Sequence, residues 1–133
     1  MAKQISLGKK EVNLINRYVR LIKQKGIKTM SINQLTEELH ESCDSIMEFA
    51  NGIDKEVYLS VDIDILDPAF APATGYKEPG GLTTRELLYI LQRINKLKNL
   101  RALDIVEINE QLDKEKYSRM TTKIGAKILS EFL

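Results

Sequence analysis

Two aspartates, Asp62 and Asp64, follow an apolar run near the middle of the chain. Side chains at positions i and i+2 of an extended segment point the same way, so both carboxylates can converge on one centre. A divalent cation removes the repulsion between them, and carboxylate oxygens suit hard ions such as Mg²⁺ or Mn²⁺. The spacing therefore predicts part of a metal site, although turn-forming aspartates after a strand share this pattern.

A long loop follows the aspartates and extends through residue 81. It contains all three prolines of the protein and three of its seven glycines. Loops of this length are uncommon without a function. Asp67, directly before Pro68, is interpreted as a turn residue and not as a ligand. Small residues typical of close backbone packing around a site stand further along the loop: Thr74, Gly75, Gly80 and Gly81.

The elements that must position these residues alternate between helices and strands. Apolar residues at helical spacing predict a helix that carries Val12, Ile15, Val19 and Ile22 and ends at Gly26. A second helix is predicted from a capping-box pattern at Ser31 to about Ala50, followed by a turn at Asn51-Gly52. Thr83 with Glu86 forms a further capping-box pattern that begins a third helix. The last predicted helix carries Met120, Ile124, Ile128 and Phe132.

Strands are predicted at residues 27–30, 56–61 and 100–106. Strands that alternate with helices imply βαβ units, so we expect an α/β fold with three layers and a mainly parallel sheet flanked by helices. Ligands in such sheets bind outside the carboxyl ends of the strands. Asp62 and Asp64 end the second predicted strand and Glu107 follows the third, so all three should lie at one edge of the sheet.

Composition excludes several classes of protein. The 133 residues carry a net charge of +1, which gives no electrostatic footprint for nucleic acid. No apolar stretch approaches the length needed to cross a bilayer. The single cysteine, Cys43, is compatible with a reducing cytoplasm and is interpreted as core filler. The single histidine, His40, is interpreted as a solvated or half-buried helix residue.

Three segments together resemble the signature of the ureohydrolases, the family that includes arginase, agmatinase and formiminoglutamase. Residues 60–75 read Ser-Val-Asp-Ile-Asp-Ile-Leu-Asp-Pro-Ala-Phe-Ala-Pro-Ala-Thr-Gly, and residues 78–83 read Glu-Pro-Gly-Gly-Leu-Thr. Residues 102–109, Ala-Leu-Asp-Ile-Val-Glu-Ile-Asn, resemble the last active-site strand of the family. The resemblance extends from about Gly8 to the end of the chain.

The resemblance implies a binuclear Mn²⁺ enzyme that hydrolyses a C–N bond of a guanidino compound such as arginine or agmatine. By position, Asp62 would bridge the two ions, Asp64 would ligate one of them, and a hydroxide between the ions would be the nucleophile. Glu107 would hold the substrate's guanidinium group through a fork-to-carboxylate pairing. Asp104 would support that strand.

The chain resembles only the C-terminal half of such an enzyme. The family's remaining metal ligands, a histidine and an Asp/His cluster, come from the other half of the fold, and this chain offers only His40. Residues 1–133 are therefore interpreted as one partial arginase-like domain, and the isolated chain is expected to be inactive. A second chain would supply the rest of the site, and we expect the protein to form oligomers.

Two other functions are compatible with parts of the sequence. The chain could be a non-catalytic remnant or an interaction module that uses an exposed strand edge and apolar face for association. An Asp-x-Asp pair also serves Mg²⁺-dependent phosphoryl and glycosyl transferases. Gly80-Gly81 lacks the strand–Gly-x-Gly–helix context of a phosphate-binding loop, which counts against a transferase.

Overall fold

The computed structural model describes residue 17 and residues 19–133, and it divides the chain into two units, residues 1–31 and residues 32–133. In the first unit, residues 19–24 are helical and a turn follows at Lys25 and Gly26. Gly26 has φ +63°, a left-handed conformation that glycine adopts at little cost. The helix predicted before Gly26 is thus confirmed where it is described, while Val12 and Ile15 lie outside the described residues.

The strand predicted at residues 27–30 is wrong, because this segment has no regular secondary structure. Its two apolar residues remain accessible, since Ile27 is 54% exposed and Met30 is 39% exposed. A strand needs a neighbour to satisfy its backbone groups. In the described part of the chain, the sheet contains only the two strands that come later in the sequence.

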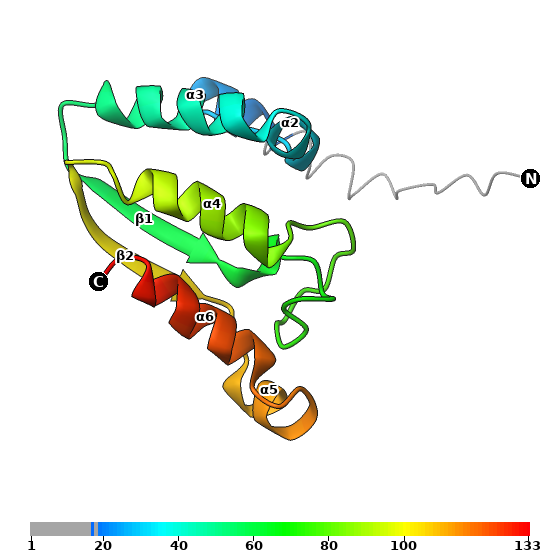
Figure 1. The fold of residues 1–133 in the computed structure, drawn as a ribbon. Coiled ribbons are helices and arrows are strands. Elements are labelled where there is room, and N and C mark those ends of the chain that lie inside the picture. Colours follow the sequence, from blue (N-terminus) through cyan, green and yellow to red (C-terminus); the bar gives the residue numbers. More distant parts are fainter. Residues whose placement is uncertain (1–16, 18) are drawn as a thin grey trace, which may run out of the picture. The chain divides into compact units, whose positions relative to one another are not determined.

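The sheet of the second unit is formed by β1 (Val57–Asp62) and β2 (Leu100–Val106), which run parallel (Figure 1). Both strands were predicted, β2 with its observed bounds. Their register places Asp62 opposite Val106, so the two carboxyl ends lie at the same edge of the sheet. On one side of the sheet Val61 is 5% exposed and Leu59 and Ile105 pack against the core.

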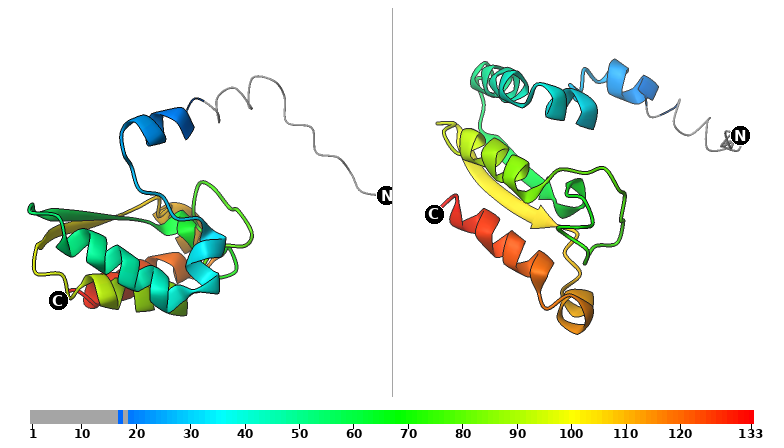
Figure 2. Two further views of the ribbon diagram at one scale, coloured as in Figure 1. Left: turned by 90° about the horizontal axis from the view of Figure 1, so that it is seen from above. Right: turned by 45° about the vertical axis from the view of Figure 1, so that its right-hand side comes forward.

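The helices of this unit are α2 (Ile32–Glu37), α3 (Leu39–Asn51), α4 (Thr84–Ile94), α5 (Glu110–Lys116) and α6 (Met120–Ser130). The helix predicted between Ser31 and Ala50 is divided at Glu38, whose φ of −131° and ψ of 59° are not helical. Helix α5 was not predicted. Helices α3, α4 and α6 lie together on one face of the sheet (Figure 2).

The start of α4 shows why this segment is helical. The Thr83 hydroxyl accepts a hydrogen bond from the Glu86 amide at 3.2 Å, and Glu86 Oε2 accepts one from the Thr83 amide at 2.8 Å. This reciprocal pair is the predicted capping box, which satisfies backbone donors that a helix start leaves free. One face of the helix is apolar and buried, through Leu87, Ile90 and Leu91.

The core lies between the sheet and this helical layer. Its buried members come from β1, from the turn and loop that follow it, and from α3, α4 and α6: Cys43, Val61, Ile63, Leu66, Ala71, Leu82, Leu87, Ile90, Leu91 and Ile128. The interpretation of Cys43 as core filler is confirmed, because it is 1% exposed, and burial raises the pKa of its thiol. His40 is an exposed helix residue, as expected, and its Nδ1 lies 2.5 Å from the Tyr89 hydroxyl.

The opposite face of the sheet is polar near its middle. The Tyr58 hydroxyl donates a hydrogen bond to Asp104, and hydrogen bonds from Tyr58 and Ser60 lower the pKa of the Asp104 carboxyl. Tyr58 is 60% exposed, which shows that none of the described residues covers this face at that point.

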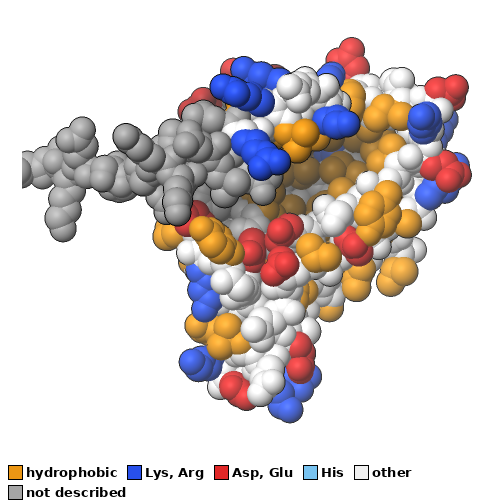
Figure 3. Space-filling view, turned by 180° about the vertical axis from the view of Figure 1, so that it is seen from behind, with side chains coloured by type: hydrophobic (Ala, Val, Ile, Leu, Met, Phe, Trp, Pro, Cys, Tyr) orange, Lys and Arg blue, Asp and Glu red, His pale blue; other side chains and the backbone are white. Residues whose placement is uncertain are grey.

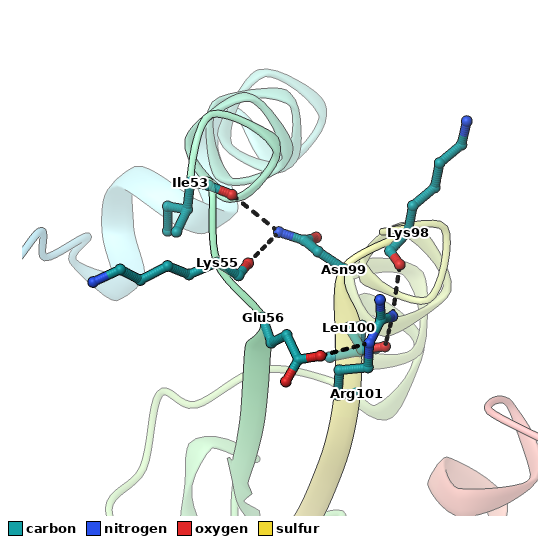
Figure 4. A network of polar contacts seen from close by, with 7 residues as sticks. All are labelled: Ile53, Lys55, Glu56, Lys98, Asn99, Leu100 and Arg101. Atoms are coloured by element: carbon teal, nitrogen blue, oxygen red, sulfur yellow. Dashed lines mark hydrogen bonds and ion pairs between the residues drawn. The ribbon is translucent and has the colours of Figure 1, made fainter.

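A polar network closes the amino ends of the two strands, far along the sheet from the aspartates (Figure 4). The Asn99 side-chain amide donates to the carbonyls of Ala50, Ile53 and Lys55 at 3.0–3.4 Å. Arg101 pairs with Glu56 at 3.2 Å, but both side chains are more than half exposed, so this ion pair contributes little to stability.

The prediction of an α/β fold with a parallel sheet flanked by helices is therefore confirmed, and within the described residues helices α3, α4 and α6 cover one face of the sheet, so two of the three expected layers are present. The helices follow the strands in the order expected for a βαβ unit, with α4 between β1 and β2. Among the described residues, no helix is long and apolar enough to span a membrane.

Candidate functional site

Asp62 is the last residue of β1, and its side chain organises the turn that follows. Residues Ile63–Ile65 form a 3₁₀ turn, and Asp62 Oδ1 accepts a hydrogen bond from the Asp64 amide at 2.9 Å. The extended geometry assumed for Asp62 and Asp64 is therefore wrong, because the chain leaves the strand between them. The capping hydrogen bond is the reason, since it favours a tight turn over a continued strand.

Asp64 holds a buried oxygen that has no hydrogen-bond partner among the described residues. This atom, Oδ1, is one of three such side-chain atoms. A carboxylate oxygen buried without a partner is costly, so the position favours a bound cation or donor. Asp64 also lines a cavity of about 260 Å³, and Glu78 is a second acidic residue in the lining of this cavity.

Glu107 follows directly after β2 and has φ 68°. This left-handed conformation costs a residue with a side chain about 1–2 kcal/mol. A Cβ built on Gly75 would lie 3.6 Å from Glu107 Oε2, so the Thr74–Gly75 part of the loop lies beside this carboxylate. The side chain itself is exposed.

A chain of hydrogen bonds holds the loop against the end of β2. The Asn109 amide donates to the Ala73 carbonyl at 2.9 Å, and the Ala73 amide donates to the Thr121 hydroxyl at 3.0 Å. Thr121 is fully buried at the start of α6. Both contacts hold the loop at Ala73, two residues before Gly75, which lies beside Glu107.

Asp113 completes this arrangement from α5. Its carboxylate is fully buried and accepts hydrogen bonds from the amides of Thr121 and Thr122, at 3.1 and 2.6 Å, and from the Thr122 hydroxyl at 2.7 Å. Burial works to raise its pKa, but the hydrogen bonds from Thr122 and Thr121 outweigh burial and the pKa lies below its usual value. Asp113 is therefore a charged brace that joins α5 to α6.

The other end of the loop is held by backbone pairing and by Asp67. Leu66 and Leu82 form a parallel bridge, and the Asp67 carboxylate accepts the amides of Ala69 and Gly80, both at 2.8 Å. These two hydrogen bonds lower the pKa of Asp67. The interpretation of Asp67 as a turn residue is confirmed.

Gly81 allows the close approach of the two ends of the loop. A Cβ at this position would meet the Asp67 amide nitrogen at 2.5 Å and backbone atoms of Leu66 and Ile65 at 2.6 and 2.7 Å. Backbone atoms cannot move aside as a flexible side chain can, so the position requires glycine.

The structure brings Asp62, Asp64 and Glu107 to one edge of the sheet but does not gather them into one cluster. Within residues 17 and 19–133, no three His, Cys, Asp or Glu side chains come close enough to hold a metal ion. The unpartnered oxygen of Asp64 fits a metal ligand, while the small number of convergent donors does not fit a closed metal site.

Sequence reasoning missed two acidic residues of this edge, Glu78 and Asp113. Glu78 stands in the Glu-Pro-Gly-Gly segment, and its position two residues before the Gly80 anchor could have indicated a side chain near the site. No signal in the sequence marks Asp113, because its partners belong to a helix that begins seven residues later.

A family model described as "Arginase family" matches residues 5–133. The chain is 33% identical to the hepatic arginase of Aquarana catesbeiana over 94% of this chain and 39% of that protein. It is 43% identical to the proclavaminate amidinohydrolase of Streptomyces clavuligerus over 59% of this chain and 25% of that protein. The chain thus spans well under half the length of these curated relatives.

Solved structures give the same result for the fold. The formimidoylglutamase of Bacillus subtilis matches with a TM-score of 0.80 and 25% identity, over 97% of this chain and 37% of that chain. The proclavaminate amidinohydrolase matches with a TM-score of 0.72 and 32% identity, over 83% of this chain and 35% of that chain. The architecture of residues 32–133 is accordingly arginase-like.

Proposed function

This chain belongs to the arginase family, and from that premise we propose that it supplies part of the active site of a hydrolase for guanidino compounds. The chain would correspond to the C-terminal part of such an enzyme and would act in the cytoplasm. The observation that carries the proposal is the buried, unpartnered oxygen of Asp64 beside Asp62, at the edge of the sheet where Glu107 also lies.

Asp62 and Asp64 would hold Mn²⁺. Asp62 gives one oxygen to the Asp64 amide, and a carboxylate has further lone pairs for a cation. Bound Mn²⁺ ions would lower the pKa of water and so supply a nucleophile at neutral pH. Because two carboxylates cannot complete the coordination of two ions, the other ligands would come from another polypeptide.

Glu107 would bind the guanidinium group of the substrate. A carboxylate accepts two parallel N–H hydrogen bonds from a guanidinium, which fixes the plane of that group as well as its position. The backbone of Glu107 has a left-handed conformation, and the Asn109–Ala73 hydrogen bond holds the segment that follows it. The backbone position from which the carboxylate extends is therefore fixed. Arginine and agmatine share this guanidinium group, so either is a candidate substrate.

The test is to co-express the chain with a polypeptide that carries the histidine and Asp/His ligands of the family, and to measure urea release from arginine and from agmatine in Mn²⁺. We expect release by the pair and none by this chain alone. Asp62→Ala should abolish it, while Asp54→Ala, an exposed aspartate before β1, should leave it unchanged. Absence of urea or any other amidino product from all combinations would refute the proposal.

The metal ligands can be tested without catalysis. Mn²⁺ broadens the NMR signals of nuclei close to it, so a titration of the chain should broaden the amides of residues 62–65 first. Asp64→Ala should remove this selective broadening, with Asp54→Ala again as the control. Broadening spread evenly over all acidic residues would show that Asp62 and Asp64 are not a specific site.

A second candidate function is that of a non-catalytic, oligomer-forming module. The exposed sheet face around Tyr58 and the free edges of a two-stranded sheet favour association. Sedimentation separates the two functions, because a monodisperse monomer at all concentrations would exclude a self-associating module.

A further inference from the structure

Lys77 is a single positive charge in an otherwise acidic stretch of the chain. Between Lys55 and Arg85 the sequence contains five acidic residues and no other basic one: Glu56, Asp62, Asp64, Asp67 and Glu78. Lys77 lies on the exposed part of the loop, two residues after Gly75, which is the residue beside the Glu107 carboxylate. The one cation of this stretch is therefore close along the chain to the carboxylate that would bind a guanidinium.

The ammonium of Lys77 is held in place but is not neutralised. Its Nζ lies 3.5 Å from the Tyr117 hydroxyl and 5.3 Å from the centroid of the Tyr117 ring. Tyr117 follows the last residue of α5 and is partly buried. Among the described residues no ion pair joins Lys77 to a carboxylate. Because an ammonium has three N–H donors and no acceptor, Lys77 keeps donors and a full charge for another group.

The end of α5 on which Lys77 rests is itself basic. Residues 114–119 contain Lys114, Lys116 and Arg119 but only one acidic residue, Glu115, and all four side chains are exposed. Figure 3, which views the molecule from behind, shows acidic side chains gathered near the middle of this face and basic side chains among acidic ones on its lower part, where α5 lies. Positive charge on the α5 side of the loop thus faces an acidic sheet edge.

The separation of the two charges suits a small guanidino compound. Gly75 and Lys77 are two Cα–Cα steps apart, a span of at most about 7.6 Å. A guanidinium that donates both terminal NH₂ groups to Glu107 directs its substituent away from that carboxylate. Residues 75–79 are the exposed part of the loop beside Glu107, so a short aliphatic linker brings the far end of the compound to the side chains of this segment.

We propose that Lys77 is a specificity-determining residue that pairs with a carboxylate at the far end of the substrate. The site then selects guanidino acids over guanidino amines, because an amine at that end would meet the ammonium with like charge. The inference rests on the proposed function, since it needs Glu107 to bind the guanidinium. The contact with Tyr117 restricts the lysine side chain beforehand, so less conformational entropy is lost when the pair forms.

The test uses three probes that differ mainly at one end: γ-guanidinobutyrate ends in a carboxylate, butylguanidine in a methyl group and agmatine in an amine. NMR titrations of the full 133-residue chain follow two signals, the amide of Glu107 and the side-chain Cε of Lys77. We expect γ-guanidinobutyrate to bind about threefold to fivefold more tightly than butylguanidine, as an exposed ion pair allows, and agmatine to bind most weakly. Only γ-guanidinobutyrate should shift the Lys77 signal, and added salt should reduce the difference in affinity.

Substitutions of the lysine give the matched comparison. Lys77→Met keeps the length of the side chain without its charge and should bring the three affinities close together, and Lys77→Glu should reverse their order. Lys98→Met removes an exposed charge at the amino ends of the strands and should leave the order unchanged. Circular dichroism establishes that each variant folds. Equal affinities in the unaltered chain, or an unchanged order in Lys77→Met, would overturn the role of Lys77.

Glu107→Gln separates this inference from the proposed function, because it should weaken the binding of all three probes. Equal affinities that Glu107→Gln lowers together would refute the lysine and leave the proposed function standing. If γ-guanidinobutyrate shifted Lys77 equally in Glu107→Gln, Glu107 would not be the guanidinium site, and the proposed function and this inference would both fail. Absence of binding by all three probes would also overturn both.

Discussion

The carboxyl ends of β1 and β2 lie at the same edge of the sheet but are built differently. Beyond β2, Glu107 stands on a backbone that is fixed through Asn109, Ala73 and Thr121. Beyond β1, Asp64 keeps a buried oxygen without a partner. At the end of β2, the residues that support Glu107 all belong to this chain. At the end of β1, no described residue supplies a hydrogen-bond partner for the buried oxygen of Asp64.

This difference separates two tasks. In the proposed function, recognition of a guanidinium would need one well-placed carboxylate, and Glu107 and the residues that support it all lie within residues 73–121. The proposed two-metal centre would need ligands from several strands, and the two described strands would supply only part of them. Substitutions near β2 should therefore alter stability through contacts inside this chain. The effects of substitutions at Asp62 and Asp64 should depend on added metal or on a partner.

The largest effect is expected from Asp113→Ala. The substitution removes the buried acceptor of the Thr121 and Thr122 amides, so we expect a loss of about 3 kcal/mol in the free energy of unfolding. Urea denaturation measures this change. Glu110→Ala, an exposed position on the same helix, is the control and should change stability by less than about 0.5 kcal/mol. Equal losses in both variants would show that Asp113 is not the brace.

A loss of about 1–3 kcal/mol is expected from Gly81→Ala, because the new methyl group would overlap backbone atoms of residues 65–67. Gly75→Ala is the matched control, since its Cβ would meet Glu107 at an ordinary contact distance. Thermal unfolding of the two variants compares the two ends of the loop directly. If Gly81→Ala proved as stable as Gly75→Ala, the bridge between Leu66 and Leu82 would tolerate a greater distance between the two backbone segments.

A smaller effect is expected from acid. The pKa of Asp113 is lower in the folded chain than its ordinary value near 3.9, so the unfolded chain binds the proton more tightly. The stabilisation is therefore complete above about pH 5 and declines as the pH falls through the folded pKa. Denaturation curves between pH 7 and pH 2 should show this decline, and Asp113→Asn should flatten it. An unchanged slope in Asp113→Asn would assign the decline to other carboxylates.

The smallest effect is expected from Glu107→Asn, and its sign is opposite. Asparagine adopts the left-handed conformation more readily than glutamate, so stability should rise by about 0.5–1 kcal/mol. Guanidinium binding should be lost at the same time. Glu110→Asn, at a helical position, should not stabilise the chain. A destabilised Glu107→Asn variant would mean that the carboxylate contributes contacts that offset the backbone strain.

Local signals in the sequence predicted much of the fold. The Thr83–Glu86 capping box, the strand at residues 100–106 and the burial of Cys43 each depend on neighbours in sequence or on simple apolar patterning, and each is confirmed. The failures depend on distant partners. Residues 27–30 have strand-like composition but no strand beside them, and α5 is short and mostly polar, so periodicity does not reveal it.

The candidate site was predictable in its location but not in its geometry. The position of Asp62, Asp64 and Glu107 at one edge follows from the topology of a parallel sheet. The turn at residues 63–65 depends on a single side-chain hydrogen bond, which competes with continuation of the strand. The role of Asp113 depends on contacts with another helix, and no spacing within the sequence indicates them.

The loop is attached to the rest of the unit at Ala73 and at Gly80, so its stability depends little on the length of the segment between these two residues. Residues 75–79 are exposed and lie between Ala73, bound to Thr121, and Gly80, bound to Asp67. For a flexible segment between fixed ends, doubling the length costs only about 0.6 kcal/mol of closure entropy. Insertions here would leave both anchors in place while changing the wall beside Glu107. This short exposed segment is therefore where related chains could diverge in what they admit to the site with the least effect on folding.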